Sequence, residues 1–255
     1  MLNALKLVDN SGYTYADYAS WPDDDIRREL IGGVVYMMSR PTILHQIVNT
    51  QLSWQFASFL KGKPCKVITE PEVRLFPLPD QSDDTVVAPD LIVVCNRAKL
   101  GRLSYNGVPD LVVEILSPST AWKDRGEKCA LYERAGVKEY WIVDPQKKTV
   151  RVHLLQNGAY ASRTYTADEA VPVAVLFGCV IDMPGVWAEA DELGAPAEAE
   201  EFFSAKDIAA QYGLDIQQVR GWAITHKIPY LMQEGCQEYL WDEDSLAKLY
   251  SDIGR

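Results

Sequence analysis

The chain has 255 residues, of which 47% are hydrophobic and 24% are charged, and its formal net charge is −11. This composition is typical of a folded protein with one large domain or two modest ones. The chain holds no apolar run near the roughly 18 residues that a membrane span needs, and its start lacks the apolar core of a signal peptide. We therefore expect a cytoplasmic protein without a membrane partner, and the acidic charge does not indicate a nucleic-acid-binding surface.

The first half of the chain alternates turn signals with apolar segments. Apolar residues recur at helical spacing through one long segment, and alternate with polar residues in another. The predicted elements are, in order, a short helix from Pro22 to Arg28, a strand pair in 29–38 around Gly32-Gly33, a helix over 42–60 that Gly62 ends, and a half-buried strand over 66–76.

The second half contains two short, continuous apolar runs, 86–95 and 111–116. Such runs are typical of central strands that are covered on both faces. A helix to about Ala135 follows the second run, capped in the stretch 117–120. The further predicted strands are 139–144, 149–155, 160–165 and 171–180.

Residues 188–201 are acidic and rich in alanine, with little apolar surface to bury, so we interpret them as a linker. The predicted organisation is a large domain over 1–187, this linker, and a small module over 202–255.

The five cysteines form no CxxC motif and no Cys/His cluster. An odd count without a pairing signal fits a reducing compartment and argues against structural zinc. Because most of them lie in apolar runs, we expect small core residues. They are Cys65, Cys95, Cys129, Cys179 and Cys236.

Two carboxylates lie on the predicted central strands, Asp90 after Pro89 and Glu114 inside the run 111–116. A carboxylate in an apolar strand is costly unless it is paired or binds a metal. Hard oxygen ligands on rigid neighbouring strands suit a divalent metal that hydrolyses a phosphodiester. The alternatives are a turn aspartate for Asp90 and a residue on a solvated strand face for Glu114.

Several motifs occur together in a fixed order and spacing over roughly residues 15–185. They are residues 29–36, His45, and the stretches 88–91, 109–120, 124–128, 131–132, 135–137 and 139–145. This set resembles the Uma family, a bacterial group classed among restriction endonucleases of the PD-(D/E)XK superfamily.

The resemblance implies a restriction-endonuclease-like α/β (α+β) domain, a mixed sheet flanked by helices. It also implies an endonuclease that hydrolyses DNA phosphodiesters with Mg²⁺ or Mn²⁺ bound by Asp90 and Glu114. The superfamily's usual lysine position holds Leu116 here, and the resemblance suggests that Lys128 supplies the lysine from the following helix. Glu29 resembles an auxiliary acid of the superfamily. A homodimer is plausible because cutting both strands needs two sites.

Each of these residues also has an ordinary structural alternative. Lys128 has the spacing of an exposed ion-pair partner of Asp124 at i+4. Glu29 could instead be a polar residue on a strand, and His45 a histidine that begins the long helix. We interpret His153 as a surface strand residue.

The sequence of the module over 202–255 predicts a small, mainly helical winged helix-turn-helix domain, with helices over 204–212, 215–225 and 242–250. It resembles the DNA-binding domains of excisionase and MerR proteins. On that reading Arg220, His226 and Lys227 would contact DNA. Its excess of acidic residues is poor for DNA affinity, so a protein-interaction or dimerisation module is the alternative. The alternative function of the chain is a catalytically inactive nuclease-fold regulator or a protein-interaction protein that uses this module.

Overall fold

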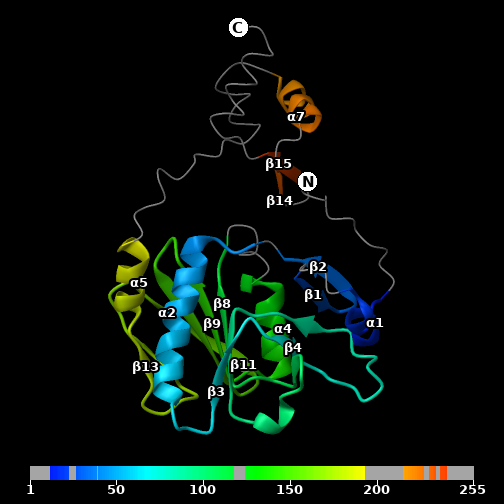
Figure 1. Ribbon diagram of the computed structural model, residues 1–255. Helices are drawn as coiled ribbons and strands as arrows, with labels where there is room; N and C mark the ends of the chain where they lie inside the picture. The colour runs from blue at the N-terminus through cyan, green and yellow to red at the C-terminus, as the bar shows by residue number, and fades with distance from the viewer. Residues whose placement is uncertain are drawn as a thin grey trace. The chain divides into compact units, whose positions relative to one another are not determined.

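The computed structural model describes residues 12–22, 27–38, 40–117, 124–192, 215–226, 230–233 and 236–239 (Figure 1). The chain divides into two compact units, Met1–Glu192 and Leu193–Arg255. Across these described ranges, no helix combines the length and the apolar character that crossing a membrane requires.

A six-stranded mixed sheet forms the centre of the first unit. Its order is β11-β10-β9-β8-β6-β3, in which β8 and β9 are parallel and the other neighbours are antiparallel. The strands are β3 (Lys66–Thr69), β6 (Leu91–Val94), β8 (Leu111–Ile115), β9 (Glu139–Asp144), β10 (Thr149–Gln156) and β11 (Ala159–Tyr165).

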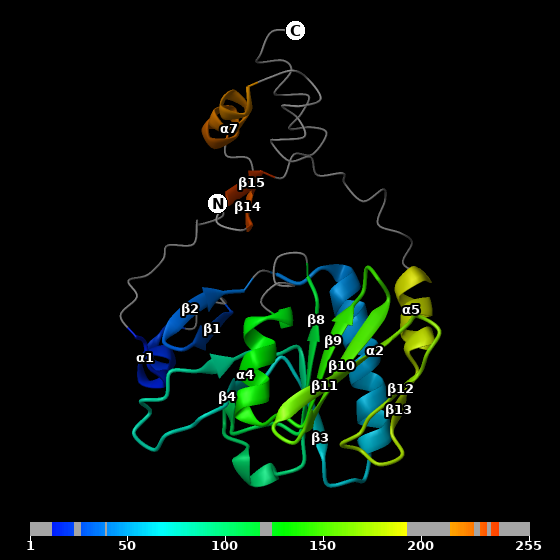
Figure 2. The same cartoon turned by 180° about the vertical axis from the view of Figure 1, so that it is seen from behind.

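Helices cover both faces of this sheet, as Figures 1 and 2 show. The helix α2 (Ile43–Leu60) begins at Thr42, whose side chain caps it, and packs its apolar side on one face. The helix α4 (Glu127–Ala135) packs on the other face. The central strands β6, β8 and β9 are therefore buried on both sides. For β6 and β8 this confirms the prediction made from their continuous apolar runs.

A second, five-stranded sheet has the order β2-β1-β5-β4-β7. Its strands are β1 (Arg28–Ile31), β2 (Val34–Met37), β4 (Glu72–Arg74), β5 (Val86–Val87) and β7 (Ser104–Asn106). The predicted pair around Gly32-Gly33 is confirmed: β1 and β2 are antiparallel, and both glycines have positive φ.

Two predicted strands are wrong in extent, because each divides between the two sheets. The segment 66–76 breaks after Thr69, where Glu70 adopts a φ of 49° before a proline, giving β3 and β4. The segment 86–95 breaks at residues 88–90 into β5 and β6. In the segment 86–95, a continuous apolar pattern does not reveal such a change of sheet, since both β5 and β6 are buried.

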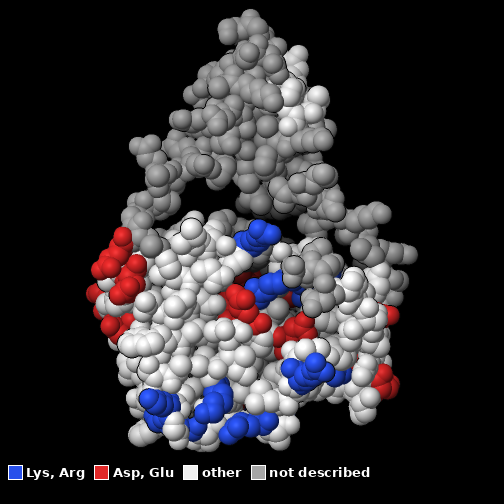
Figure 3. Space-filling view, viewed as in Figure 1, with Lys and Arg blue, Asp and Glu red and all other residues white. Residues whose placement is uncertain are grey.

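Three smaller boundaries also differ from the predictions. The first helix is α1 (Tyr15–Ser20), capped by Thr14, which was not predicted. Residues 23–26 of the expected helix from Pro22 to Arg28 lie outside the described residues, and Arg28 lies in a strand. The segment 171–180 is not one strand: it begins with β12 (Val171–Pro172) and ends at the start of β13 (Val180–Ile181), which pairs with β12. The expected linker start at 188 is helical instead, since α5 (Met183–Glu192) extends through it with its acidic side chains on the surface (Figure 3).

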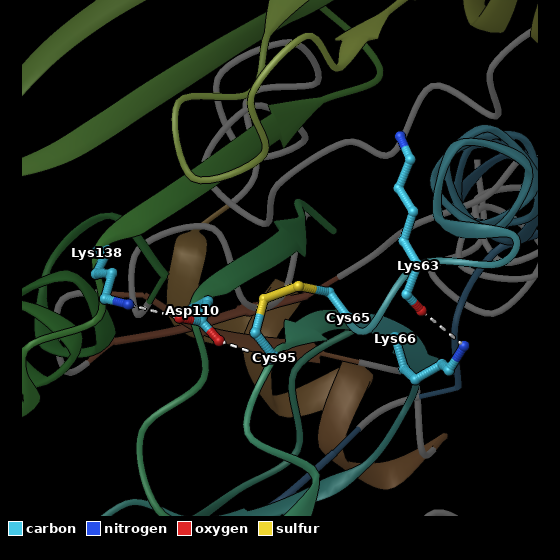
Figure 4. Close-up of a disulfide and its surroundings, with 6 residues drawn as sticks. All are labelled: Lys63, Cys65, Lys66, Cys95, Asp110 and Lys138. Carbon is cyan, nitrogen blue, oxygen red and sulfur yellow. Dashed lines mark hydrogen bonds and ion pairs between the residues drawn. A yellow bond between two sulfur atoms is a disulfide. The ribbon is translucent and has the colours of Figure 1, made fainter.

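Two cysteines are joined, which overturns the expectation of unpaired core thiols. Cys65 and Cys95 form a disulfide, with their Cα atoms 4.0 Å apart (Figure 4). They directly flank the paired residues Lys66 and Val94, so the antiparallel register of β3 and β6 brings them together. The two cysteines are 30 positions apart in the sequence, so only the register of β3 against β6 shows that they pair. Their spacing in the sequence does not give that register.

The prediction that His153 is a surface strand residue is also wrong, because this residue is only 5% exposed. Its Nδ1 lies 2.8 Å from Ser162 Oγ, and its ring contacts Tyr140 and Tyr160. Burial, together with the charge of Arg151, lowers the pKa of His153 to about 4. The native imidazole is therefore neutral under conditions in which an unfolded chain would protonate it.

We expect this histidine to make the fold acid-sensitive. The unfolded state binds a proton near pH 6.5 and the native state only near 4, so stability contributed by neutral His153 falls as the pH drops through this window. Between pH 7 and 5.5 the loss is about 1 kcal/mol. Urea unfolding of wild type and His153→Gln at both pH values measures it, and equal losses in the two proteins would contradict it. Burial lowers the pKa of His45, but the hydrogen bond and charge of Asp90 outweigh this effect and raise it, so His45 contributes with the opposite sign in both proteins and cancels.

The described part of the second unit contains α7 (Ile216–Thr225) and a hairpin of β14 (Tyr230–Gln233) and β15 (Cys236–Tyr239). Asp215 Oδ1 accepts the Gln218 N–H at 3.2 Å, which caps α7 as predicted. The expected helices over 204–212 and 242–250 lie outside the described residues.

Candidate active site

Four predicted site residues come from separate elements at one end of the strands. Glu29 lies on β1, Glu114 on β8 and Lys128 on α4, while Asp90 directly precedes β6. All four are at most 7% exposed. The second sheet therefore contributes an acid to a site that is otherwise built on the central sheet and its helix.

Lys128 is the centre of a buried ion cluster. Its Nζ lies 2.7 Å from Glu29 Oε1, 2.7 Å from Glu114 Oε1 and 3.7 Å from Asp124 Oδ1. The i+4 pair with Asp124 expected for an exposed lysine is present, but here both side chains are buried. Lys128 thus joins acids from two sheets to α4.

Hydrogen bonds fix the carboxylates of this cluster. The Tyr132 hydroxyl donates to Glu114 Oε1 at 2.7 Å, and the Ala88 N–H donates to Glu29 Oε1 at 3.0 Å. Tyr140 donates to the backbone carbonyl of Asp124 at 3.0 Å. These donors come from the core, so the acids have little freedom to turn away from Lys128.

Asp90 is held beside this cluster by two donors to the same oxygen. The Ile115 N–H donates to Asp90 Oδ2 at 2.7 Å, and His45 Nε2 lies 3.2 Å from it. Because Ile115 follows Glu114 in β8, the Asp90 carboxylate lies against the backbone of the residue next to Glu114. Sequence reasoning left the role of His45 open, and its signal was the match in the family motif.

The cluster has more negative than positive charge. Burial raises the pKa of Glu114, and the neighbouring carboxylates of Asp124, Asp90 and Glu29 raise it further, against the opposing effect of Lys128. Burial alone would lower the pKa of Lys128, but the surrounding acids outweigh it and raise that pKa. Lys128 is therefore a firmly charged ammonium, and one lysine does not balance the acids around it.

The donor chemistry fits a divalent cation. The acids offer hard oxygen atoms, and their excess negative charge would be relieved by a bound ion. Among the described residues no three His, Cys, Asp or Glu side chains form a ready-made metal cage. The ammonium of Lys128, instead, lies between Glu29 and Glu114.

The residues predicted to contact DNA lie in the second unit. His226 stacks on Trp222, with ring centroids 3.8 Å apart, and its Nδ1 lies 2.9 Å from the Trp222 carbonyl oxygen. Arg220 belongs to α7, and Lys227 lies outside the described residues. Their contact with DNA stays a prediction.

Known proteins resemble this chain in sequence and in fold. A curated relative, the uncharacterized protein slr1290 of Synechocystis, is 26% identical over 156 residues, which cover 60% of this chain and 80% of that protein. A crystal structure from Anabaena variabilis, described as a putative nuclease belonging to DUF820, matches with a TM-score of 0.59 at 19% identity. It covers 70% of this chain and 99% of that one.

The structural match shows a shared mixed α/β fold. The family match is more specific, since residues 15–184 fit Uma2, described as "Putative restriction endonuclease". That range contains Glu29, Asp90, Glu114 and Lys128, and it spans well over half of the chain. The chain therefore belongs to the Uma2 family of restriction-endonuclease-like proteins.

Proposed function

We propose that this protein is an endonuclease that hydrolyses phosphodiester bonds of DNA with the aid of a divalent metal ion. The observation that carries the proposal is the buried set of Glu29, Glu114 and Asp124 around Lys128, with Asp90 held beside it. Buried charges that the core itself orients are costly to maintain, and such clusters concentrate at functional sites.

In this proposal Asp90 and Glu114 hold Mg²⁺ or Mn²⁺, which would supply a Lewis acid and lower the pKa of an attacking water. The chain's own residues set the geometry. Asp90 Oδ2 is occupied by the Ile115 N–H and His45, so the orientation of the carboxylate is fixed before any ligand arrives. Lys128 brings a permanent positive charge that can stabilise charge developing on the phosphate.

Plasmid nicking tests the proposal. We expect wild type to nick supercoiled DNA with Mg²⁺ or Mn²⁺, and Asp90→Asn to show no activity above background. Asp191→Asn is the matched control, because this carboxylate is 61% exposed and pairs with Lys148 at the surface. Equal nicking by wild type and Asp90→Asn would show that the activity does not come from this site.

The second candidate is a catalytically inactive nuclease-fold regulator. The observation that favours it is the ammonium of Lys128 between Glu29 and Glu114, where it already occupies the space next to both carboxylates. Isothermal titration with Mn²⁺ separates the two candidates. Binding that is lost in Glu114→Gln supports the endonuclease, and equal heats in both proteins support the regulator.

The second unit is proposed to bring the protein to DNA through α7, as the recognition helix of a helix-turn-helix. The capped helix and the hairpin that follows it support this proposal. A pair of copies, one for each strand, is proposed for double-strand cleavage.

A further inference from the structure

A polar groove opens beside the candidate active site. It has a volume of about 390 Å³, within the range of roughly 300–1,000 Å³ of ligand pockets. One wall is a polar side of α2, and the other is the end of β3 with the turn that follows it. The groove is lined by Gln46, Asn49, Thr50, Ser53, Thr69 and Glu70.

Each wall of the groove has a residue at or beside a contact of Asp90. The backbone N–H of Glu70 donates to the Asp90 carbonyl oxygen at 2.9 Å. On the other wall, Gln46 directly follows His45, whose Nε2 lies 3.2 Å from Asp90 Oδ2. The groove therefore lies near Asp90 through the backbone of Glu70, on the β3 side of β6, while the Asp90 carboxylate is hydrogen-bonded on the β8 side.

The lining is suited to a neutral polar ligand. The described residues that line the groove include no lysine or arginine, and their charged member, Glu70, is a carboxylate that pairs with Arg27 at 3.4 Å. Figure 3 shows that the surface along α2 is almost free of charged side chains until the end of the helix. A phosphate would face no cation from the lining and would meet the charge of Glu70, whereas a base edge offers both donors and acceptors.

Asn49 is a buried polar side chain in the lining of the groove. It is only 4% exposed, on a helix whose neighbouring buried positions Val48 and Leu52 are apolar. Ser53 Oγ donates to the Asn49 carbonyl oxygen at 2.6 Å and contacts its Oδ1 at 3.4 Å. A side-chain amide kept in this position at the groove wall is equipped to hydrogen-bond a ligand.

We propose that the groove binds the base of a nucleotide that flanks the scissile phosphodiester, through the amides of Gln46 and Asn49. The inference rests on the proposed nuclease function and names the part of the substrate that lies near Asp90. Amide side chains that form paired hydrogen bonds with a base edge contribute roughly 1–3 kcal/mol, or about 5- to 150-fold in affinity.

Fluorescence anisotropy with a labelled mixed-sequence DNA duplex tests this proposal, using the full-length chain with Asp90→Asn to prevent cleavage. We expect Gln46→Ala and Asn49→Ala each to raise Kd at least about 5-fold. The dependence of log Kd on log salt should keep its slope, because no phosphate contact is removed. Gln51→Ala is the matched control, an amide on the same helix outside the groove, and should leave Kd unchanged.

An unchanged Kd in Gln46→Ala would overturn the groove proposal, and so would a salt slope that falls by about one, which indicates a phosphate contact. Gln46 is exposed, so this variant keeps the test valid if the buried Asn49→Ala fails to fold. The nicking assay reports separately on hydrolysis. If cleavage depends on Asp90 while Gln46→Ala leaves Kd unchanged, the groove proposal is wrong and the nuclease proposal stands. If Gln46→Ala raises Kd while cleavage does not depend on Asp90, the nuclease proposal is wrong and the groove still binds a base.

Discussion

Replacing Lys128 by methionine is expected to lower the free energy of unfolding by about 3–5 kcal/mol. Methionine keeps most of the volume of the side chain, so the loss reports on charge and not on a cavity. Glu29, Glu114 and Asp124 would then be buried without their shared cation, and the N–O distances of 2.7 Å to two of them show how closely it is paired. Urea unfolding at pH 7 measures the change.

Lys138→Met is the matched control. Lys138 Nζ also lies 2.7 Å from a carboxylate oxygen, that of Asp110, but its side chain is 66% exposed. We expect a loss below about 1 kcal/mol, because solvent screens an exposed pair. Similar losses in the two variants would mean that burial does not strengthen the Lys128 cluster.

A second substitution separates charge imbalance from lost packing. Glu114→Gln in the Lys128→Met protein removes one of the acids that have lost their shared cation, and we expect it to restore part of the lost stability. The two changes should therefore be far from additive, as contacting residues in one network are. Additive losses would place the cost in packing around Lys128 instead.

Part of the candidate site could be predicted from the sequence. Asp90 and Glu114 stood out as carboxylates in apolar strands, and family motifs pointed to Lys128 and Glu29. The partners that hold them gave a weaker signal. Asp124 and Tyr132 lie in the motif stretches 124–128 and 131–132 but were given no role there beyond the i+4 spacing of Asp124 from Lys128. The hydroxyl of Tyr132 reaches Glu114 through tertiary packing.

Fold prediction failed where tertiary structure decides between equivalent local patterns. The continuous run 86–95 fits one buried strand as well as two, and the change of sheet at residues 88–90 depends on what packs around it. His153 alternates along β10 as a surface residue would, yet α4 and β11 place Cys129 and Ser162 against it. Strongly periodic segments such as α2, by contrast, were predicted to within a residue.

Loss of the Cys65–Cys95 disulfide is expected to lower the free energy of unfolding by about 2–4 kcal/mol. The bond closes a loop across a sequence separation of 30, which restricts the unfolded chain, and it joins the ends of β3 and β6 (Figure 4). We therefore expect a reductant to lower the Tm of wild type. The double variant Cys65→Ala/Cys95→Ala should unfold at the lower Tm with or without reductant.

Cys129→Ala is the control for reductant effects elsewhere, since the structure has Cys129 as a free thiol. This variant should keep the full response to reductant.

The effect of reduction also carries information about the candidate site, because β6 has the disulfide at one end and Asp90 at the other. If reduction lowers Tm while Mn²⁺ binding is unchanged, the central strands alone hold Asp90 in place. If metal binding weakens together with Tm, the edge strand β3 and its covalent link to β6 support the candidate site from the far end of the same strand. A Tm that does not respond to reductant in wild type would contradict a stabilising role for the bond.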